Sequence, residues 1–515
     1  MSFSDLPPAI LFLVASHLKE EAIWLAQYAS INRPWQSVVE ALTFRELRTE
    51  SIEHLRQIPQ YMNRDRWDAM RSLDVIVHLP EYERERWYQI ETNEDKQINN
   101  AIFSDFMMKL FETVNTWEQY RNDAPRFTLA IQAISMSDYW HLGRLNRMKR
   151  YANATRGAED IRIQASYLRL TGNLPSLSAI SGLIVRGARN VRIIKPGRSC
   201  CPRLLSGESV CRIVRACPNV NKAEVDLSDQ ESKDLGLRNA ERSAFATSFT
   251  GLPQGLRHLK ISYPGVVPAN QLFSPPSIPV VDGKDFLSYR LNMISRQLQY
   301  LEIKAVLSDD FFDMTDPATA WPLLQSLSID FDPCTPSGDW MLELDPTDSD
   351  VEPDHERAYE FEVRMGGYKS EAEWPAKMHF PRRSFRTAVN SDILDDISLA
   401  AARALTKMPS LRDLKLNVGD GQAETGCLCS LTSDGRSSHK VVWRSRSATM
   451  YEPHADVIAA WKQVFAERTG ELEIQVIGPS VQCLADSVPL SILLFFVNQL
   501  HNRLDCVYGI DHGLR

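Results

Sequence analysis

The chain has 515 residues, of which 43% are hydrophobic and 24% are charged, and its formal net charge is −8. This length exceeds what one ordinary hydrophobic core contains, so we expect about two to four domains. The acidic balance argues against a general binder of nucleic-acid backbones, which needs a clustered positive field, and we expect no nucleic-acid partner.

Cysteine usage and the absence of export signals indicate the compartment. The nine cysteines are an odd number, spread thinly over the chain, which does not fit a closed set of disulfides. The first residues have neither the basic nor the apolar region of a secretory signal, and no run reaches the ~18 apolar residues of a membrane span. We therefore expect a cytoplasmic or nuclear protein without a membrane partner.

Residues 5–47 have the pattern of three short helices. Asp5 is a good N-cap for the first and Asn32 for the third, and the second runs over about residues 20–30. The first segment has apolar residues at helical spacing, at Ile10, Leu11, Leu13, Val14 and Leu18. They cover a face wider than one packing stripe needs. Three such helices bury too little surface to be stable alone, so the unit needs the following domain, a partner, or both.

An ordered set of positions in these helices resembles the F-box family: Leu6-Pro7-x-x-Ile10-Leu11, Val14, Leu18, Ser30, Asn32-Arg33-x-Trp35 and Phe44-Arg45-x-Leu47. An F-box is a short helical unit that docks on the Skp-type adaptor of cullin-based ubiquitin ligases. The resemblance implies adaptor-binding roles for Leu6, Pro7, Ile10, Val14, Leu18 and Trp35. Residues 1–50 are therefore assigned to an F-box-like module, whose partners would be the adaptor and, through it, a cullin. Helical spacing alone leaves open that these helices only cap a larger domain.

A recurring pattern, apolar-x-x-apolar-x-apolar, predicts short strands in the remainder of the chain. Clear copies begin at Leu256, Leu298, Leu324 and Leu411, and weaker ones at Ile180 and Val220. Further strands are expected at 73–79, 127–134, 161–170 and 472–477. Helices are expected at 207–216, 234–249, 284–296, 392–407 and 454–468. Alternating strands and helices of this length favour parallel pairing with right-handed crossovers.

The repeated pattern resembles the strand segment of leucine-rich repeats, which many F-box proteins use to hold their targets. That family places Asn or Cys three residues after the last apolar position, where this chain has Pro264, Val306, Asp332 and Gly419. We therefore assign residues 51–515 to an irregular leucine-rich-repeat-like α/β solenoid. An unrelated α/β domain with parallel strands is the alternative.

An acidic stretch interrupts this domain at about residues 333–386. It contains many carboxylates and little apolar material, which favours a solvated, partly mobile loop over a contact for a basic partner.

We find no motif for catalysis, for a metal or for a cofactor. The sequence has no phosphate-binding Gly-rich loop, no Gly-x-Ser-x-Gly elbow and no zinc-type cysteine spacing around Cys200, Cys201, Cys211 and Cys217. The leading hypothesis is a non-enzymatic substrate-recognition subunit of a Skp–cullin–F-box ubiquitin ligase with an unknown protein target. A leucine-rich-like interaction scaffold outside ubiquitin transfer is the alternative, and an enzyme with a site of dispersed residues is a third.

Overall fold

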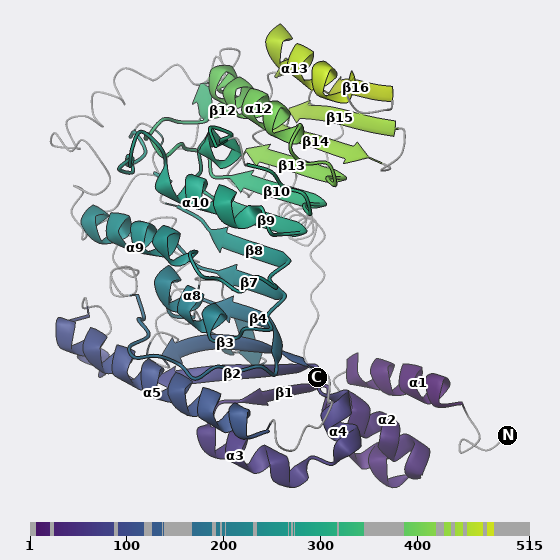
Figure 1. The fold of residues 1–515 in the computed structure, drawn as a ribbon. Helices are drawn as coiled ribbons and strands as arrows, with labels where there is room; N and C mark the ends of the chain where they lie inside the picture. Colours follow the sequence, from purple (N-terminus) through teal and green to yellow (C-terminus); the bar gives the residue numbers. More distant parts are fainter. Residues whose placement is uncertain are drawn as a thin grey trace, which may run out of the picture.

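The protein is described from a computed structural model (Figure 1). It describes residues 7–20, 25–86, 91–117, 126–135, 137, 167–187, 192–195, 198–200, 202–229, 234–265, 267–268, 271, 273–316, 319–344, 386–418, 427–433, 438–445, 451–466 and 471–477. The predicted α/β class is confirmed, because the chain forms one large, mostly parallel sheet with several helices.

A small helical unit comes first in the chain. It consists of α1 (Pro8–Glu20), the 3-10 helix η2 (Leu25–Ser30) and α2 (Arg33–Thr43). The Asn32 side chain caps α2 by accepting a hydrogen bond from the Trp35 backbone N–H at 2.9 Å, as its sequence position predicts. The unit has its own small core, formed by Leu11, Ala15, Leu25, Trp35, Val38, Val39 and Leu42.

The helical unit is joined directly to the sheet. Strand β1 (Glu46–Thr49) pairs with β2 (Ser72–Leu79), so the sheet begins before the boundary predicted at residue 50. Arg66 of α4 (Arg64–Ala69) binds both carboxylate oxygens of Glu40 in α2, at 2.7 and 2.9 Å. Its guanidinium also lies 4.6 Å from the centre of the Phe44 ring. The helical unit is therefore supported at the junction that follows it, as its thin core requires.

Within the described residues, twelve strands form the main sheet, and their order in space follows their order in the chain. The strands are parallel from β1 to β13, β14 and β15 are antiparallel to their predecessors, and β16 is parallel to β15. The remaining strands are β3 (Phe127–Ser135), β4 (Ile180–Arg186), β7 (Lys222–Asp226), β8 (His258–Tyr263), β9 (Tyr300–Ala305), β10 (Ser326–Phe331), β13 (Asp413–Val418), β14 (Cys427–Ser433), β15 (Ser438–Ser445) and β16 (Glu471–Ile477).

The sequence pattern is in register across neighbouring strands. Leu259 of β8 lies opposite Leu301 of β9, which lies opposite Leu327 of β10. The last apolar positions of the pattern align in the same way, with Ile303 between its counterparts in β8 and β10. Because side chains alternate along a strand, these residues all point to one face, whereas Glu302 between them points to the other. The predicted one-sided burial is therefore confirmed.

The helices stack on one side of the sheet and cover the apolar face (Figure 1). They are α3 (Ile52–Tyr61), α5 (Asn93–Trp117), α8 (Gly207–Arg215), α9 (Leu235–Ser248), α10 (Phe286–Ser295), α12 (Ser391–Leu405) and α13 (Ala455–Ala466), whereas α4 lies beside α2. Five of these helices, α8, α9, α10, α12 and α13, lie within a few residues of their predicted ranges. None of the described helices combines the length and apolar composition needed to cross a bilayer.

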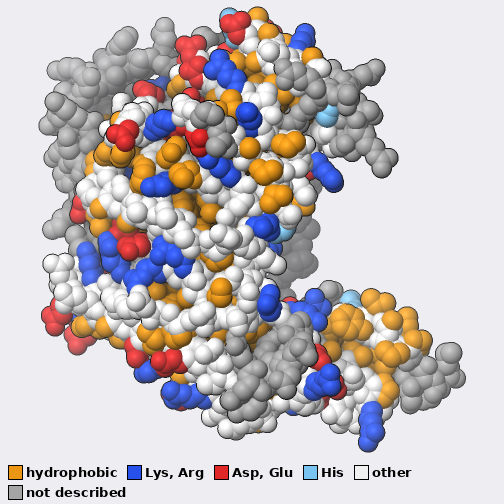
Figure 2. All heavy atoms as spheres, in the orientation of Figure 1, with side chains coloured by type: hydrophobic (Ala, Val, Ile, Leu, Met, Phe, Trp, Pro, Cys, Tyr) orange, Lys and Arg blue, Asp and Glu red, His pale blue; other side chains and the backbone are white. Residues whose placement is uncertain are grey.

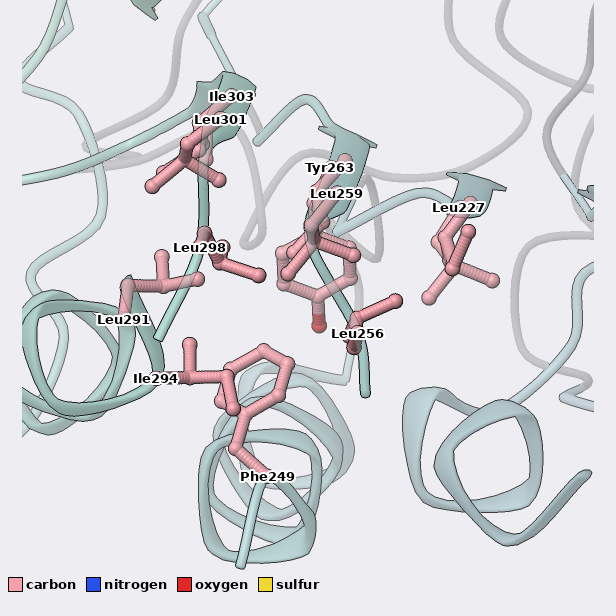
Figure 3. Packing of buried hydrophobic residues seen from close by; sticks show 14 of the residues in the cluster. Leu227, Phe249, Leu256, Leu259, Tyr263, Leu291, Ile294, Leu298, Leu301 and Ile303 are labelled. Carbon is pink, nitrogen blue, oxygen red and sulfur yellow. The ribbon is translucent and has the colours of Figure 1, made fainter. Parts of the chain in front are cut away.

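One continuous hydrophobic core joins this helical layer to the sheet. Figure 3 shows the part between β8, β9, α9 and α10, where Leu298 lies between the strands and Ile294 of α10. Leu298 is fully buried although it comes before the strand itself. The first apolar residue of the pattern therefore fills the core below the sheet, and its truncation to alanine would cost about 2–5 kcal/mol.

The acidic interruption is narrower than the sequence suggested. Residues 333–344 pack onto the domain, with Cys334 and Trp340 buried and the Trp340 indole N–H donating to the carbonyl of Phe273 at 3.0 Å. Strands β11 (Leu342–Leu344) and β12 (Arg386–Val389) then pair antiparallel. Residues 345–385, the rest of the acidic loop predicted at 333–386, lie outside the described residues, as do residues 161–166 of a predicted strand.

Candidate functional site

The residues predicted to bind an adaptor occupy different environments in the helical unit. Pro7 and Ile10 are exposed, and Ile10 has 43% of its surface accessible. Val14 and Leu18 are half-buried against the small core, and Trp35 is 2% exposed within it. Leu6 lies outside the described residues. Any contribution of Trp35 to adaptor binding would therefore act through the packing of α1 on α2.

Other apolar side chains extend this exposed surface. Phe12, Leu13 and Ile31 are 37%, 65% and 53% exposed. Figure 2 shows hydrophobic side chains gathered on the helical unit, at the right of the view. Leu13 belonged to the broad apolar stripe seen in the sequence, but Phe12 and Ile31 did not stand out there. We call the exposed apolar residues of α1, Ile10, Phe12 and Leu13, the α1 surface, and Ile31 lies in the link between η2 and α2.

Other apolar residues of α1 are buried rather than exposed to solvent. Leu11 and Ala15, on the same helix, are fully buried against α2. Packing of α1 onto the unit therefore buries one stripe of the helix. Of its exposed apolar residues, Ile10 and Leu13 are three positions apart and share a side, whereas Phe12 lies on another side. Clustered exposed apolar residues of this kind are typical of interaction sites.

The second candidate surface is the face of the sheet opposite the helices, which we call the open face. It carries alternate residues of strands β7 to β13: Lys222, Glu224, Asp226, His258, Lys260, Ser262, Tyr300, Glu302, Lys304, Ser326, Ser328, Asp330, Asp413, Lys415 and Asn417. Positive and negative side chains alternate across it, as in the ion pair between Lys260 and Glu302 at 2.8 Å. A surface that neutralises itself in this way does not provide the single-sign field of a nucleic-acid site.

An aromatic pair stands at the amino-terminal end of the open face. The rings of His258 and Tyr300 are stacked 4.4 Å apart at an interplanar angle of 11°. Burial and the nearby Lys222 lower the pKa of His258, which favours the neutral ring at physiological pH. Tyr300 is 40% exposed, and its hydroxyl donates to Gln325 Oε1 at 3.0 Å. Exposed, oriented tyrosines of this kind are frequent in protein-binding surfaces.

A buried charge network lies at the carboxyl ends of β7, β8 and β9. Asp229 accepts from Arg238 at 3.1 Å and from Arg242 at 3.4 Å, and Arg242 also reaches Asp285 at 3.1 Å. Arg242 donates a further bond to the carbonyl of Val306 at 2.7 Å. These side chains join α9, the first turn of α10 and the loops after the strands. The network therefore holds successive layers together.

Asp332 lies nearby and holds another turn. Its carboxylate accepts the backbone N–H of Gly265 at 2.7 Å, and burial raises its pKa to about 6. Its side-chain oxygen thus satisfies a backbone amide in a turn.

No group of three or more His, Cys, Asp or Glu side chains in the described part of the chain is arranged to hold a metal ion. Burial raises the pKa of Cys211 to about 11 and that of Cys217 to about 12, which keeps both as unreactive thiols. Of the cysteine cluster noted in the sequence, Cys201 lies outside the described residues.

Comparison with known proteins gives one partial match. Residues 375–486 match a family of unknown function, DUF6546. Within the described residues, this segment includes β12, α12, the antiparallel pair β14 and β15, α13 and β16. No curated protein matches the chain.

Proposed function

We propose that the protein is a substrate-recognition subunit of a Skp–cullin–F-box ubiquitin ligase. The helical unit would bind the Skp-type adaptor, and through it a cullin, while the α/β domain, as an irregular leucine-rich-repeat-like solenoid, would hold a protein target. The protein itself would catalyse no bond chemistry. It would raise the effective concentration of target lysines near the charged conjugating enzyme.

The observation that carries the proposal is the exposure of the α1 surface. Ile10, Phe12 and Leu13 lie in solvent on a helix whose neighbouring stripe is already packed. These side chains are 37–65% exposed, so a partner that buries the rest of one gains about half of the 1.5–3 kcal/mol for complete burial, and the three together supply part of a binding free energy. Ile10 is also one of the positions that the F-box resemblance assigns to the adaptor.

The strand arrangement supports the second half of the proposal. The twelve strands follow one another in chain order, and each pattern residue aligns with its counterpart in the next strand. This is the arrangement in which each layer buries its neighbour, as in solenoids. The open face, with exposed Tyr300 and self-paired charges, is the surface we assign to the protein target.

Adaptor binding is tested with a double variant of the α1 surface. Ile10→Ser with Leu13→Ser should abolish co-purification of a Skp-type adaptor, because it removes apolar contacts without opening the core. The matched control is Val280→Ser with Val281→Ser, which changes two valines that are exposed elsewhere. Undiminished adaptor binding in the Ile10/Leu13 variant would contradict the proposal, as would no adaptor binding by the unmodified protein. The change Leu6→Ala with Pro7→Ala tests the resemblance itself in the same assay.

A scaffold outside ubiquitin transfer is the second candidate, and the junction with the sheet favours it. The bidentate contact between Glu40 and Arg66 and the continuation into β1 are what a cap of the sheet requires. Deletion of residues 1–43 separates the two functions. If the helices are only a cap, the remainder loses its cooperative unfolding transition. If they are a docking module, the remainder stays folded and only adaptor binding is lost.

A further inference from the structure

The two ends of the main sheet differ in charge. Helices α8, α9, α10 and α12 each end at the edge of the sheet where the next strand begins. Their amino termini carry carboxylates, as at Glu208, Asp234 and Asp285. Their last turns carry no carboxylate, and α8 and α12 have Arg215 and Arg403 there. This distribution complements the helix dipoles and makes the edge where the strands begin basic.

Four cations lie at this edge, where β7, β8 and β13 begin, and we call them the basic rim: Lys222, Arg257, Lys407 and Arg412. None of the four forms an ion pair with a carboxylate of the described residues. Three are exposed, whereas Arg257 is half-buried and donates through Nη1 to three backbone carbonyls. Figure 2 shows Lys and Arg side chains along this edge, at the right of the sheet, where the parallel strands of Figure 1 begin.

The carboxylates near the basic rim do not neutralise it. Asp316 is already paired with Arg296 at 3.3 Å. Asp413 begins β13 beside Arg412 and is exposed. One position further along the strands, the charges pair with each other, as Lys260 does with Glu302. The excess of positive charge therefore belongs to the strand starts and to the loops that precede them.

Exposed aromatic and apolar surface lies between the two sides of the basic rim. The stacked rings of His258 and Tyr300 begin β8 and β9, and Leu323, in the loop before β10, is 40% exposed. Hydrogen bonds fix this loop on both sides. The Tyr300 hydroxyl donates to Gln325 Oε1 at 3.0 Å, and the Ser410 hydroxyl, from the loop before β13, donates to a carbonyl of the Leu323 loop at 2.8 Å. The rings and the leucine are thus part of one surface with the basic rim.

We propose that an acidic segment of the protein target, with an aromatic or large apolar side chain between its carboxylates, binds across the starts of β7 to β13. The central side chain would lie against Tyr300 and Leu323. Carboxylates on its two sides would face Lys222 at one end and Arg412 at the other. Four strand spacings, about 19 Å, separate these two cations, and an extended segment of about six residues spans that length.

This inference deepens the proposed function, because it rests on the assignment of the open face to the protein target. It makes no use of the helical unit or of the adaptor. Only the chemistry of the target segment is added, which follows from the charge of the basic rim and from the rings between its two sides.

A protein segment fits this surface better than a nucleic-acid backbone does. The cations form two groups with rings and a leucine between them, rather than a continuous track. Glu224 and Glu302 also lie on the same face of the sheet, two residues along β7 and β9 from the strand starts. The evenly spaced phosphates of a nucleic acid would meet these carboxylates, whereas a peptide can place its charges at its two ends only.

The probe is a fluorescein-labelled, amidated peptide, Glu-Glu-Ser-Phe-Ser-Glu-Glu, titrated with the full chain and followed by fluorescence polarisation. We expect a dissociation constant below about 1 mM. A peptide with lysine in place of every glutamate tests the charge, and one with alanine in place of phenylalanine tests the central contact. Both should bind at least about fivefold more weakly.

Variants of the chain locate the binding site. Lys222→Gln with Arg412→Gln should weaken peptide binding about fivefold or more, because each exposed ion pair contributes modestly. The matched control, Arg64→Gln with Lys109→Gln, removes the same charge from exposed side chains of α4 and α5 and should leave the dissociation constant within about twofold. Tyr300→Ala should weaken binding, whereas Tyr300→Phe keeps the ring and should not.

The inference is overturned if the glutamate peptide does not bind, if the lysine peptide binds equally well, or if the two double variants weaken binding alike. Tighter binding of a short oligothymidylate would assign the surface to nucleic acid, and a dimer that the Lys222/Arg412 variant dissociates would assign it to a second copy. Either result also overturns the inference.

Adaptor co-purification from the same preparations separates this inference from the proposed function. If the adaptor does not bind but the peptide does, only the ubiquitin-ligase function is contradicted. If the adaptor binds and the peptide does not, only the chemistry assigned to the target segment is contradicted.

Discussion

Asp332 offers a direct measurement of what a buried carboxylate costs this fold. Burial raises its pKa from 3.8 to about 6, while the backbone N–H of Gly265 supplies its hydrogen bond. That difference corresponds to about 3 kcal/mol by which ionisation of Asp332 opposes folding above pH 6. Asparagine keeps an oxygen for the Gly265 N–H and carries no charge. We therefore expect Asp332→Asn to stabilise the protein at pH 8, by up to about 3 kcal/mol.

The raised pKa also determines how the stabilisation by Asp332→Asn changes with pH. The pKa of Asp332 is higher in the folded state than in the unfolded state. Its contribution to the stability of the fold is therefore largest below about pH 4, where the carboxyl is protonated in both states, and it falls as the pH rises to about 6. The advantage of Asp332→Asn over the unmodified protein should thus shrink as the pH falls from 8 to 4.

Urea unfolding at pH 8 and at pH 4.5 measures this advantage. Asp330→Asn, two residues before Asp332 and on the open face of β10, is the control for adding an amide. If the free energies of unfolding of Asp332→Asn and of the unmodified protein differ by the same amount at both pH values, the reasoning is refuted, because burial then does not raise the pKa of Asp332.

Three other substitutions test the packing and charge arguments by thermal or urea unfolding. Leu11→Ala should destabilise the helical unit by about 2–5 kcal/mol, since it opens a cavity in a core of few residues. If its free energy of unfolding falls less than that of an alanine substitution at an exposed position, Leu11 is not part of the core. Arg242→Met should cost about 3–5 kcal/mol, because it leaves Asp229 and Asp285 buried without their shared cation; a neutral effect would show that the network adds nothing to stability. Glu302→Gln should change stability by less than about 1 kcal/mol, because its ion pair is half exposed, and a larger loss would indicate that the open face is covered in the folded protein.

The strands predicted from the sequence were found because their pattern is local. Leu298, Leu301 and Ile303 occur at a spacing that alternation along a strand explains without knowledge of any partner. The antiparallel strands β14 and β15 were not predicted. The alternation of Val441 and Trp443 was a usable signal for β15, but the short segments around it resemble loops.

The sequence could not decide which apolar residues of the helical unit are exposed. Ile10 and Leu11 are adjacent and equally apolar, but Leu11 is fully buried and Ile10 is not. Helical spacing defines a stripe, and only the position of α2 decides which side of that stripe is covered. Trp35 illustrates the same limit, since its resemblance to an adaptor-binding position says nothing about its burial in the core.

The sequence by itself determined the α/β class, the parallel pairing, the capped helices and the polar open face, because these follow from short-range periodicity and local hydrogen bonding. Only the tertiary structure decided that β1 stops at Thr49 beside a longer β2, and that Arg242 joins Asp229 to Asp285. These features depend on residues far apart in the chain, whose approach is set by the stacking of whole layers. The α1 surface is therefore a property of the assembled fold, although each of its residues can be read in the sequence.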